Sequence, residues 1–255
     1  MPFVFSMVFF LVGILAIRQG FLEYKKKNLM RNTPTSKIRS APMGEVEIKG
    51  SVVPKDETLT SPFSNEEAVM YEYEVEEYDP DDDGGNWDTI DSGKKHVLFY
   101  VDDGTGKALV RPEGADFKLP KDNRFKVDGG TEPPQAIREF IEESKNVDSE
   151  NTKIDLKITE LSTGRDRRYT EYYIETDQDV YVFGNATNED TEENADVSEE
   201  FDVVVKDFND RASFMISDLS EEDLVSRTGK NYRIILIIGV ILTIMGFGMI
   251  LAFGI

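Results

Sequence analysis

The feature that most constrains this chain is a pair of apolar runs, one near each end. Residues 234–255 contain one polar side chain, that of Thr243, and residues 2–17 form a second, shorter run. An uncharged helix of about 20 residues is long enough to cross the hydrocarbon core of a bilayer, which is about 30 Å thick. We therefore expect two transmembrane helices, within residues 1–31 and 230–255, with one domain between them.

The shorter run has an alternative interpretation as the apolar region of a signal peptide. No Lys or Arg precedes it, however, and no small-residue cleavage site follows before Arg18. These observations favour a retained span, and we expect its helix to extend through Phe21, Leu22 and Tyr24.

Basic side chains flank both runs on the side of the central domain. They are Arg18, Lys25, Lys26, Lys27 and Arg31 after the first run, and Arg227, Lys230 and Arg233 around the start of the second. By the positive-inside rule, this pattern predicts a two-pass protein of the cell membrane with its central domain in the cytoplasm and both termini outside. The alternative is that these side chains only bind anionic headgroups of whichever leaflet they meet.

The composition excludes several classes of partner and site. Fifty acidic and 29 basic residues give a net charge of −21, and such a surface repels phosphate, so we expect no nucleic-acid partner. The acidic surface suits a salt-rich cytoplasm and indicates a haloarchaeal type of protein, although an ordinary acidic protein with a disordered tract would share it. The 255 residues contain no cysteine, which excludes disulfides, zinc sites built from thiolates and cysteine nucleophiles.

The central domain, residues 40–226, is expected to be mostly strand. Apolar and charged residues alternate with a period of two in residues 44–50 and 68–78, as in half-buried strands. Further expected strands are residues 96–102, 107–111, 153–162, 168–175, 180–184, 202–206 and 212–217. Short strands separated by turns favour a mainly β fold, an antiparallel barrel or sandwich with short helices, and an OB-like barrel is one form that it could take.

Two helices and one loop are expected within this domain. Pro134 leads into an apolar helical face made by Ile137, Phe140 and Ile141. Residues 220–229 begin with a capping box and end on a glycine, as a short helix does. Residues 188–200 contain seven carboxylates and are expected to form a solvated, mobile loop.

Two acidic motifs resemble functional loops without completing them. Residues 79–84 begin like a calcium loop, but its twelfth position is Ile90 rather than a bidentate Glu, which favours a hairpin tip. The segment Asp102-Asp103-Gly104-Thr105-Gly106 has the residues of an aspartic-protease loop in the wrong order and in a single copy. Its glycines are therefore expected to form a tight hairpin. We predict no catalytic residue, no metal ligand and no cofactor.

Two other sets of residues have side chains of the types found in binding sites. His96 is the only histidine, and because one histidine cannot build a zinc site, we expect it at the surface. A basic cluster with neighbouring tyrosines could bind a ligand or a single nucleic-acid strand, but a hairpin with strand aromatics is the favoured interpretation. The cluster comprises Arg165, Arg167, Arg168, Tyr169, Tyr172 and Tyr173.

Motifs along the central domain, taken in order, resemble the GIDE domain, also called "beside a membrane". They are Gly50-Ser-Val-Val-Pro54, Ser61-Pro62-Phe63, Tyr71-Glu-Tyr-Glu-Val-Glu-Glu77, Trp87, Phe99-Tyr-Val-Asp102, Asp103-Gly104-Thr-Gly106, Val110-Arg-Pro112, Tyr169-x-Glu171 and Val180-Tyr-Val-Phe-Gly184. The similarity covers roughly residues 40–220 and includes the position between two spans.

This resemblance implies an interaction domain held beside a membrane. The family includes the MULAN-type mitochondrial E3 ubiquitin ligases, which carry a zinc-binding RING after the second span. The present sequence reaches Ile255 without a cysteine, so we expect neither a RING nor thioester chemistry from it. The positions that match the family motifs are our candidate interaction residues: Gly50, Ser61, Pro62, Tyr71, Trp87, Phe99, Asp102, Asp103, Gly104 and Gly106.

Three functional hypotheses follow. The first is a non-catalytic scaffold whose β domain binds a membrane or cytoplasmic protein at the bilayer surface. The second is an accessory subunit of a ligase-like or proteolytic membrane complex, with catalysis supplied by another chain. The third, an OB-like nucleic-acid binder, is disfavoured by the net charge. The expected partners are therefore the lipid bilayer and a protein, without nucleic acid or zinc.

Overall fold

The computed structural model describes residues 2–80, 84–146, 165–190, 195–196, 201–207, 214–219 and 231–253. The chain divides into two compact units. The helical unit comprises residues 1–35, 210–213 and 220–255, and the β unit comprises residues 36–209 and 214–219.

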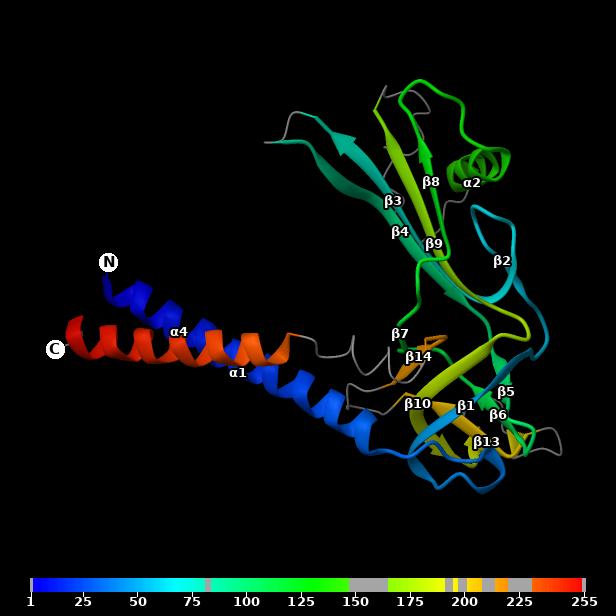
Figure 1. The fold of residues 1–255 in the computed structure, drawn as a ribbon, viewed down its shortest axis with the longest axis horizontal. Helices are drawn as coiled ribbons and strands as arrows, with labels where there is room; N and C mark the ends of the chain where they lie inside the picture. The colour runs from blue at the N-terminus through cyan, green and yellow to red at the C-terminus, as the bar shows by residue number, and fades with distance from the viewer. Residues whose placement is uncertain are drawn as a thin grey trace. The chain divides into compact units, whose positions relative to one another are not determined.

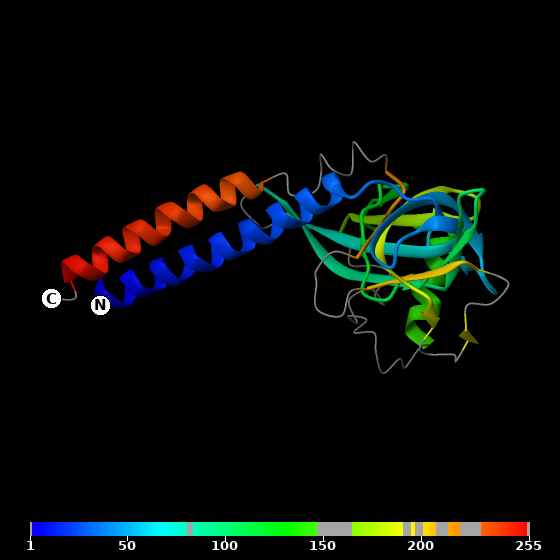
Figure 2. The same ribbon diagram turned by 90° about the horizontal axis from the view of Figure 1, so that it is seen from below.

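The helical unit contains two long helices that lie side by side and antiparallel (Figures 1 and 2). Helix α1 spans Pro2–Asn32 and helix α4 spans Tyr232–Phe253. Both contain a stretch long and apolar enough to cross a membrane, Val4–Lys25 and Tyr232–Ala252. The expectation that the first helix extends through Tyr24 is confirmed, because α1 continues to Asn32.

Small residues allow these two helices to approach closely. A Cβ atom on Gly13 would overlap Thr243, one on Gly239 would lie 2.8 Å from the backbone nitrogen of Ile17, and Gly246 faces Phe10 in the same way. Packing of this kind is the main source of helix association in lipid, where burial of apolar surface between helices gains nothing over contact with acyl chains. The hydroxyl of Thr243 donates to the carbonyl of Gly239 at 2.7 Å and so needs no other partner.

Five strands of the β unit form a closed barrel. In ring order they are β1 (Gly44–Pro54), β5 (Phe99–Asp102), β6 (Lys107–Val110), β13 (Val203–Lys206) and β10 (Asp179–Thr187), and β10 pairs with β1 to close the ring. Inward-facing residues of these strands are fully or almost fully buried and include Val46, Ile48, Val52, Phe99, Val101, Val110, Val182 and Val205. A five-stranded barrel with a crossing connection is the architecture expected for an OB-like fold.

Short elements extend the barrel. Strand β14 (Met215–Ser217) pairs with β10, and β7 (Asp116–Phe117) pairs with β14. The remaining short elements are the 3-10 turn η1 (Ile38–Ser40) and the paired strands β11 (Glu189–Asp190) and β12 (Ala195–Asp196).

A second, longer sheet stands beside the barrel within the β unit (Figure 1). Its strands are antiparallel: β3 (Glu67–Asp79) lies between β4 (Asn86–His96) and β9 (Arg167–Glu175), β9 also pairs with β8 (Asn123–Val127), and β2 (Leu59–Thr60) adds to β3. Helix α2 (Gln135–Asn146) covers one face of this sheet. The carbonyl of Pro134 accepts the first helical hydrogen bond, from the amide of Arg138 at 3.1 Å.

The predicted mainly β architecture between two apolar helices is confirmed, with corrections in detail. The barrel is not wholly antiparallel, because β6 pairs with β13 in parallel, as β7 does with β14. Strands β4 and β8 were not predicted. The tract 188–200, expected as a loop, contributes β11 and β12. The expected strand at 153–162 and helix at 220–229 lie outside the described residues.

His96, which was expected at the surface, keeps only part of its side chain exposed. Its imidazole is half-buried, with its ring centroid 6.2 Å from that of Phe117. Burial lowers the pKa of His96, and the charge of Lys94 acts in the same direction. The residue therefore helps to pack β4 against β7.

Candidate interaction surface

The long sheet has two faces of different character, set by the alternation of side chains along its strands. On β3, Tyr71, Tyr73 and Val75 point toward α2 and are buried. The intervening residues and their cross-strand partners form the opposite face, which we call the open face. It comprises Glu72, Glu74, Glu76, Tyr78, Trp87, Thr89, Ser92, Lys94, Arg124, Lys126, Arg168 and Tyr172, and Thr170 lies on the same side of the sheet but is fully buried.

The face beneath α2 is closed by aromatic packing. The ring of Phe63 makes edge-on contacts with Tyr73, Phe140 and Tyr169, at centroid distances of 5.8, 5.2 and 5.4 Å. The hydroxyl of Tyr73 donates to the carboxylate of Asp91 at 3.2 Å. Burial raises the pKa of Tyr73, and the charge of Asp91 raises it further, so this tyrosine stays protonated. This face belongs to the core.

The open face is organised around a stacked pair. The guanidinium carbon of Arg168 lies 3.7 Å from the ring centroid of Trp87, within the range of a cation–π interaction. The ring of Tyr78 lies 5.2 Å from that of Trp87. All three side chains are only partly buried. Strands β3, β4 and β9 thus each contribute one planar group to a single exposed cluster.

Ion pairs fix the position of Arg168. Its Nη2 atom lies 2.5 Å from Oε1 of Glu76, and Nη2 of Arg124 lies 3.5 Å from the other carboxylate oxygen of Glu76. Arg124 also donates from Nε to the hydroxyl of Thr170 at 3.1 Å. The Glu76 side chain is only 12% exposed, so these contacts are shielded from solvent more than a surface pair would be.

The remaining carboxylates of the open face, those of Glu72 and Glu74, have different surroundings. Glu74 accepts a hydrogen bond from the hydroxyl of Thr89 at 2.7 Å. Burial raises the pKa of Glu72, and the charge of Lys94 opposes this effect. Burial likewise raises the pKa of Tyr172, with Glu74 adding to the shift. Within the described ranges, no group of three or more Asp, Glu or His side chains is arranged to hold a metal ion.

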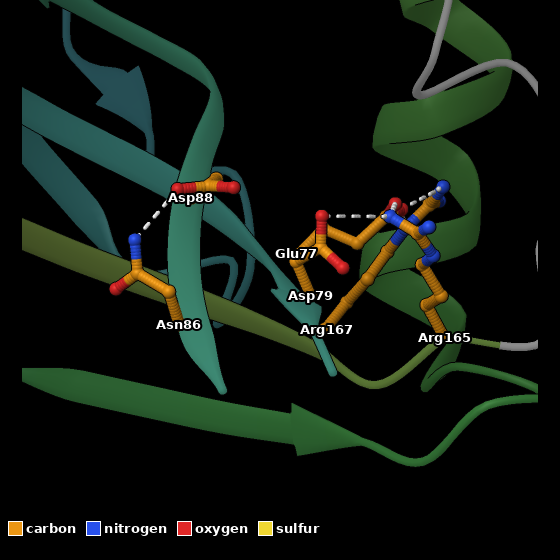
Figure 3. A network of polar contacts seen from close by, with 6 residues as sticks. All are labelled: Glu77, Asp79, Asn86, Asp88, Arg165 and Arg167. Carbon is orange, nitrogen blue, oxygen red and sulfur yellow. Dashed lines mark hydrogen bonds and ion pairs between the residues drawn. The ribbon is translucent and has the colours of Figure 1, made fainter. Parts of the chain in front are cut away.

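A second polar network lies where β3 ends and β4 begins (Figure 3). Arg167 donates from Nε and Nη2 to Glu77, each at 3.0 Å, and Arg165 lies 3.5 Å from Glu77 and 3.8 Å from Asp79. On β4, Asn86 donates to Asp88 at 3.0 Å. Asp79 pairs with Asn86 in the strand register, which confirms the predicted hairpin in this region.

A cavity of about 590 Å³ lies beside the start of α2, next to the turn at residues 130–133. Four of its polar lining residues pair with each other. Arg138 forms an ion pair with Glu132, and Gln135 donates to Glu139 at 2.7 Å. Because these groups satisfy one another, they do not converge on a common point, and we favour the open face as the site.

The motif of residues 102–106 forms the hairpin between β5 and β6, as predicted. The carboxylate of Asp103 accepts hydrogen bonds from the amides of Thr105 at 2.8 Å and Gly106 at 3.1 Å, while Asp102 accepts one from Gly104 at 2.8 Å. Gly104 has a φ of 77°, a conformation that glycine adopts at little cost. These contacts build a tight turn in which both carboxylates accept hydrogen bonds from the backbone of the hairpin.

The other candidate residues lie at separate places. Gly50 on β1 lies against the backbone of Asp102, so any side chain there would collide with β5. Phe99 is in the barrel core. Ser61 accepts a hydrogen bond from the amide of Glu66 at 2.9 Å, in the loop that contains Pro62, and Tyr71 packs beneath α2. Of the ten candidates, only Trp87 lies on the open face.

A comparison with protein families identifies the chain's relatives. The model of the GIDE family, described as E3 ubiquitin ligase, matches residues 71–252, which is more than two thirds of the chain. The chain belongs to the GIDE family. No curated protein and no solved structure matches this GIDE chain. The matched region begins at Tyr71, so Gly50, Ser61 and Pro62 lie outside it.

The family match and the two apolar helices together indicate that this GIDE chain is associated with a membrane. The cysteines that hold zinc in a RING are not in this sequence, because it contains no cysteine.

Several residues of the open face were missed from the sequence. Arg168 and Tyr172 were noticed, but were grouped with Arg167, Tyr169 and Tyr173. The period-two alternation of β9 separates them: Arg168 and Tyr172 are on the open face, whereas Tyr169 and Tyr173 are beneath α2. Applying the same alternation to β3 would have placed Glu72, Glu74, Glu76 and Tyr78 together.

Proposed function

We propose that this GIDE chain is a membrane-anchored, non-catalytic interaction domain that binds a protein partner at the bilayer surface. The two apolar helices supply the anchor, and the β unit supplies the binding surface. The acidic motif of the β5–β6 hairpin does not argue for catalysis, because its carboxylates accept hydrogen bonds from its own backbone.

The observation that carries this proposal is the cluster of Trp87, Tyr78 and Arg168 on the open face. Trp, Tyr and Arg are the side chains most enriched among residues that dominate binding energy at protein interfaces. Here they are partly exposed yet held in one arrangement, because Glu76 fixes Arg168 and Arg168 stacks on Trp87. A partner would therefore not have to pay the full entropy of ordering them.

The net charge of the chain favours encounter with a positively charged partner, whereas the open face itself is nearly balanced in charge. It carries three carboxylates and four cations: Glu72, Glu74, Glu76, Lys94, Arg124, Lys126 and Arg168. A net charge of −21 accelerates encounter with positively charged partners and repels acidic ones. Glu74 lies on the same strand as Tyr78 and on the same face, so a Lys or Arg of the partner can pair with it.

Site-specific photo-crosslinking in native membranes tests the binding surface. A photoreactive residue at Ser92, which is exposed on the open face, should form an adduct with one partner, whereas the same residue at Glu139, exposed on α2, should not. Adding Trp87→Ala should reduce the Ser92 adduct at least tenfold, the effect of losing a dominant interface residue. Equal adducts at both positions, or an adduct insensitive to Trp87→Ala, would contradict the proposal.

A second candidate function is that of an accessory subunit in a ligase-like or proteolytic complex, with catalysis supplied by another chain. The family description as E3 ubiquitin ligase favours it. Because this sequence contains no cysteine, a thioester step or a zinc-bound RING would have to be supplied by another chain. Purification of the crosslinked wild-type complex, followed by assays of that complex for transfer or proteolysis, distinguishes an accessory subunit from a simple scaffold.

The proposed orientation has the β unit in the cytoplasm and both termini outside. Two observations support it. In the sequence, the basic residues follow the first apolar run and surround the start of the second, next to the β unit in both cases. The positive-inside rule then places the β unit in the cytoplasm. The helices α1 and α4 pair in antiparallel fashion, so the two ends of the chain lie at the same end of the helical unit, as a common side for both termini requires (Figure 2).

A further inference from the structure

The helical unit contains a cavity at the end where α1 finishes and α4 begins. Its volume is about 340 Å³, and it is lined by Tyr24, Lys27, Asn28 and Arg31 of α1 and by Tyr232 and Arg233 of α4. Three of these six side chains are cationic and none is acidic. A pocket of this size is at the lower end of the range for sites that bind small ligands.

The cations of this cavity lack carboxylate partners in the described part of the chain. Lys27, Arg31 and Arg233 form no ion pair with any described Asp or Glu. The nearest acidic residue along α1, Glu23, instead accepts a long hydrogen bond of 3.5 Å from Gln19. Elsewhere in this protein, arginines are held by carboxylates, as Arg167 is by Glu77. The cavity is therefore a concentration of positive charge in a chain of net charge −21.

Two tyrosines form the wall between the helices. The rings of Tyr24 and Tyr232 lie 5.5 Å apart, and the hydroxyl of Tyr232 accepts a hydrogen bond from Nε of Arg233 at 3.0 Å. That bond uses one of the five N–H groups of the guanidinium. The N–H groups of Nη1 and Nη2 lie in one plane and can donate to two oxygens of an anion. The tyrosine hydroxyls can donate to the same anion.

The cavity adjoins the apolar surface of both helices. Phe21 on α1 is 50% exposed, and Ile234 and Ile237 on α4 are 57% and 60% exposed. Aromatic and basic side chains at the end of apolar helices are typical of the level at which lipid headgroups lie. Acyl chains of a lipid could follow the exposed apolar residues while its headgroup occupies the cavity.

From these features we infer that the cavity binds the phosphate of an anionic phospholipid. Basic pockets between transmembrane helices recognise such headgroups through charge and hydrogen bonds. A lipid fits better than free phosphate, because the cavity opens beside apolar surface that only acyl chains would cover. The inference rests on the proposed insertion of the helices in a membrane, but not on the proposed protein partner.

Native mass spectrometry of the full chain in detergent micelles, titrated with phosphatidylglycerol, tests the site. The wild-type chain should retain one phosphatidylglycerol at least fivefold more tightly than phosphatidylcholine. Arg31→Gln with Arg233→Gln should weaken retention about 25-fold, since each basic residue near an anionic surface contributes about fivefold. Arg18→Gln with Lys25→Gln removes the same charge outside the cavity and should change retention by less than twofold.

Three outcomes would overturn the inference. One is an equal loss in the two double variants, which would show bulk attraction alone. Another is equal retention of the two lipids. The third is displacement of the lipid by millimolar inorganic phosphate or glycerol phosphate, which would identify a free anion as the ligand.

Two further measurements keep the result interpretable. Arg31→Lys with Arg233→Lys keeps the charge and should retain the lipid to within about fivefold, so loss of binding through misfolding would be recognised. Flotation of every variant with neutral phosphatidylcholine vesicles reports membrane insertion separately. A variant that floats but does not retain phosphatidylglycerol has lost the site and not the anchor.

Discussion

At the scale of single residues, the carboxylate of Asp103 joins two segments of the β unit. One oxygen accepts from the amide of Ile38 in η1 at 2.9 Å, and the other accepts from Thr105 and Gly106 in the hairpin. Burial acts to raise the pKa of Asp103, but these hydrogen bonds outweigh it and hold the pKa below the ordinary value of 3.8. A motif that resembles part of an active site thus stabilises a turn.

Asp103→Asn should make the free energy of unfolding depend less on pH in the acidic range. Because the folded-state pKa is depressed, the carboxylate stabilises the fold above its unfolded-state pKa, and this contribution is lost as pH falls through the folded-state value. The variant should lose about 1–3 kcal/mol of unfolding free energy near pH 7, as expected for hydrogen bonds to a charged group. The difference from wild type should shrink below about pH 4.

Urea denaturation across pH 3–8 measures this effect. Asp56→Asn is a suitable control, because the Asp56 side chain is 77% exposed and pairs only with Lys55 at 3.6 Å. A constant difference between Asp103→Asn and wild type at every pH would show that the role of Asp103 does not depend on its charge.

At the scale of elements, a strand could be predicted from the sequence where its apolar and polar residues alternate clearly. Strand β3 was predicted almost to its ends, because Ala68 to Tyr78 alternates clearly between buried and polar positions. Strand β4 was missed, since Asn86–His96 has few apolar residues. It forms through its long pairing with β3, a tertiary effect that single-strand patterns do not contain.

The candidate site was less predictable than the fold. Trp87 was identified through the family motif. Its partner Arg168 lies 81 positions further along the chain (168 − 87 = 81). The two meet only because β3 lies between β4 and β9 and sets the register of both. Sequence periodicity can assign a residue to a face of its own strand, but it cannot identify which strands are neighbours.

The pairing of α1 with α4 predicts a sharp difference between two glycines. Gly13→Leu should force the helices apart, because even a Cβ atom would overlap Thr243, and we expect a loss of about 1–3 kcal/mol, as for other overpacked sites. Gly248→Leu should change stability by less than about 0.5 kcal/mol, because nothing lies within 4 Å of a Cβ at that position.

Thermal unfolding of the full chain in detergent, followed by circular dichroism, compares the two glycine variants. Equal melting temperatures for Gly13→Leu and wild type would show that α1 and α4 do not pack along this seam in solution.

At the scale of the whole molecule, the chain combines a helical unit and a β unit, to which we assign different proposed roles. The family match extends over parts of both, from Tyr71 in the long sheet to Ala252 in α4. The residues that we propose for lipid binding and for protein binding lie in different units, so variants at one site should leave the other site intact.

The proposed orientation predicts opposite accessibility for the terminus and the β unit. The sequence contains no cysteine, so a single cysteine can be introduced without background. In intact cells, a membrane-impermeant maleimide should label a cysteine added before Met1 but not Ser92→Cys. After permeabilisation, both should be labelled. Labelling of Ser92→Cys in intact cells would place the β unit outside.

The stacking of Arg168 on Trp87 also makes the protein its own optical reporter. Trp87 is the single tryptophan in the chain, and its indole lies in the cluster that we propose to meet a partner. Its emission therefore originates from one known place on the molecular surface. Any molecule that covers the cluster would change the polarity around this fluorophore, so binding could be followed by intrinsic fluorescence, without a label.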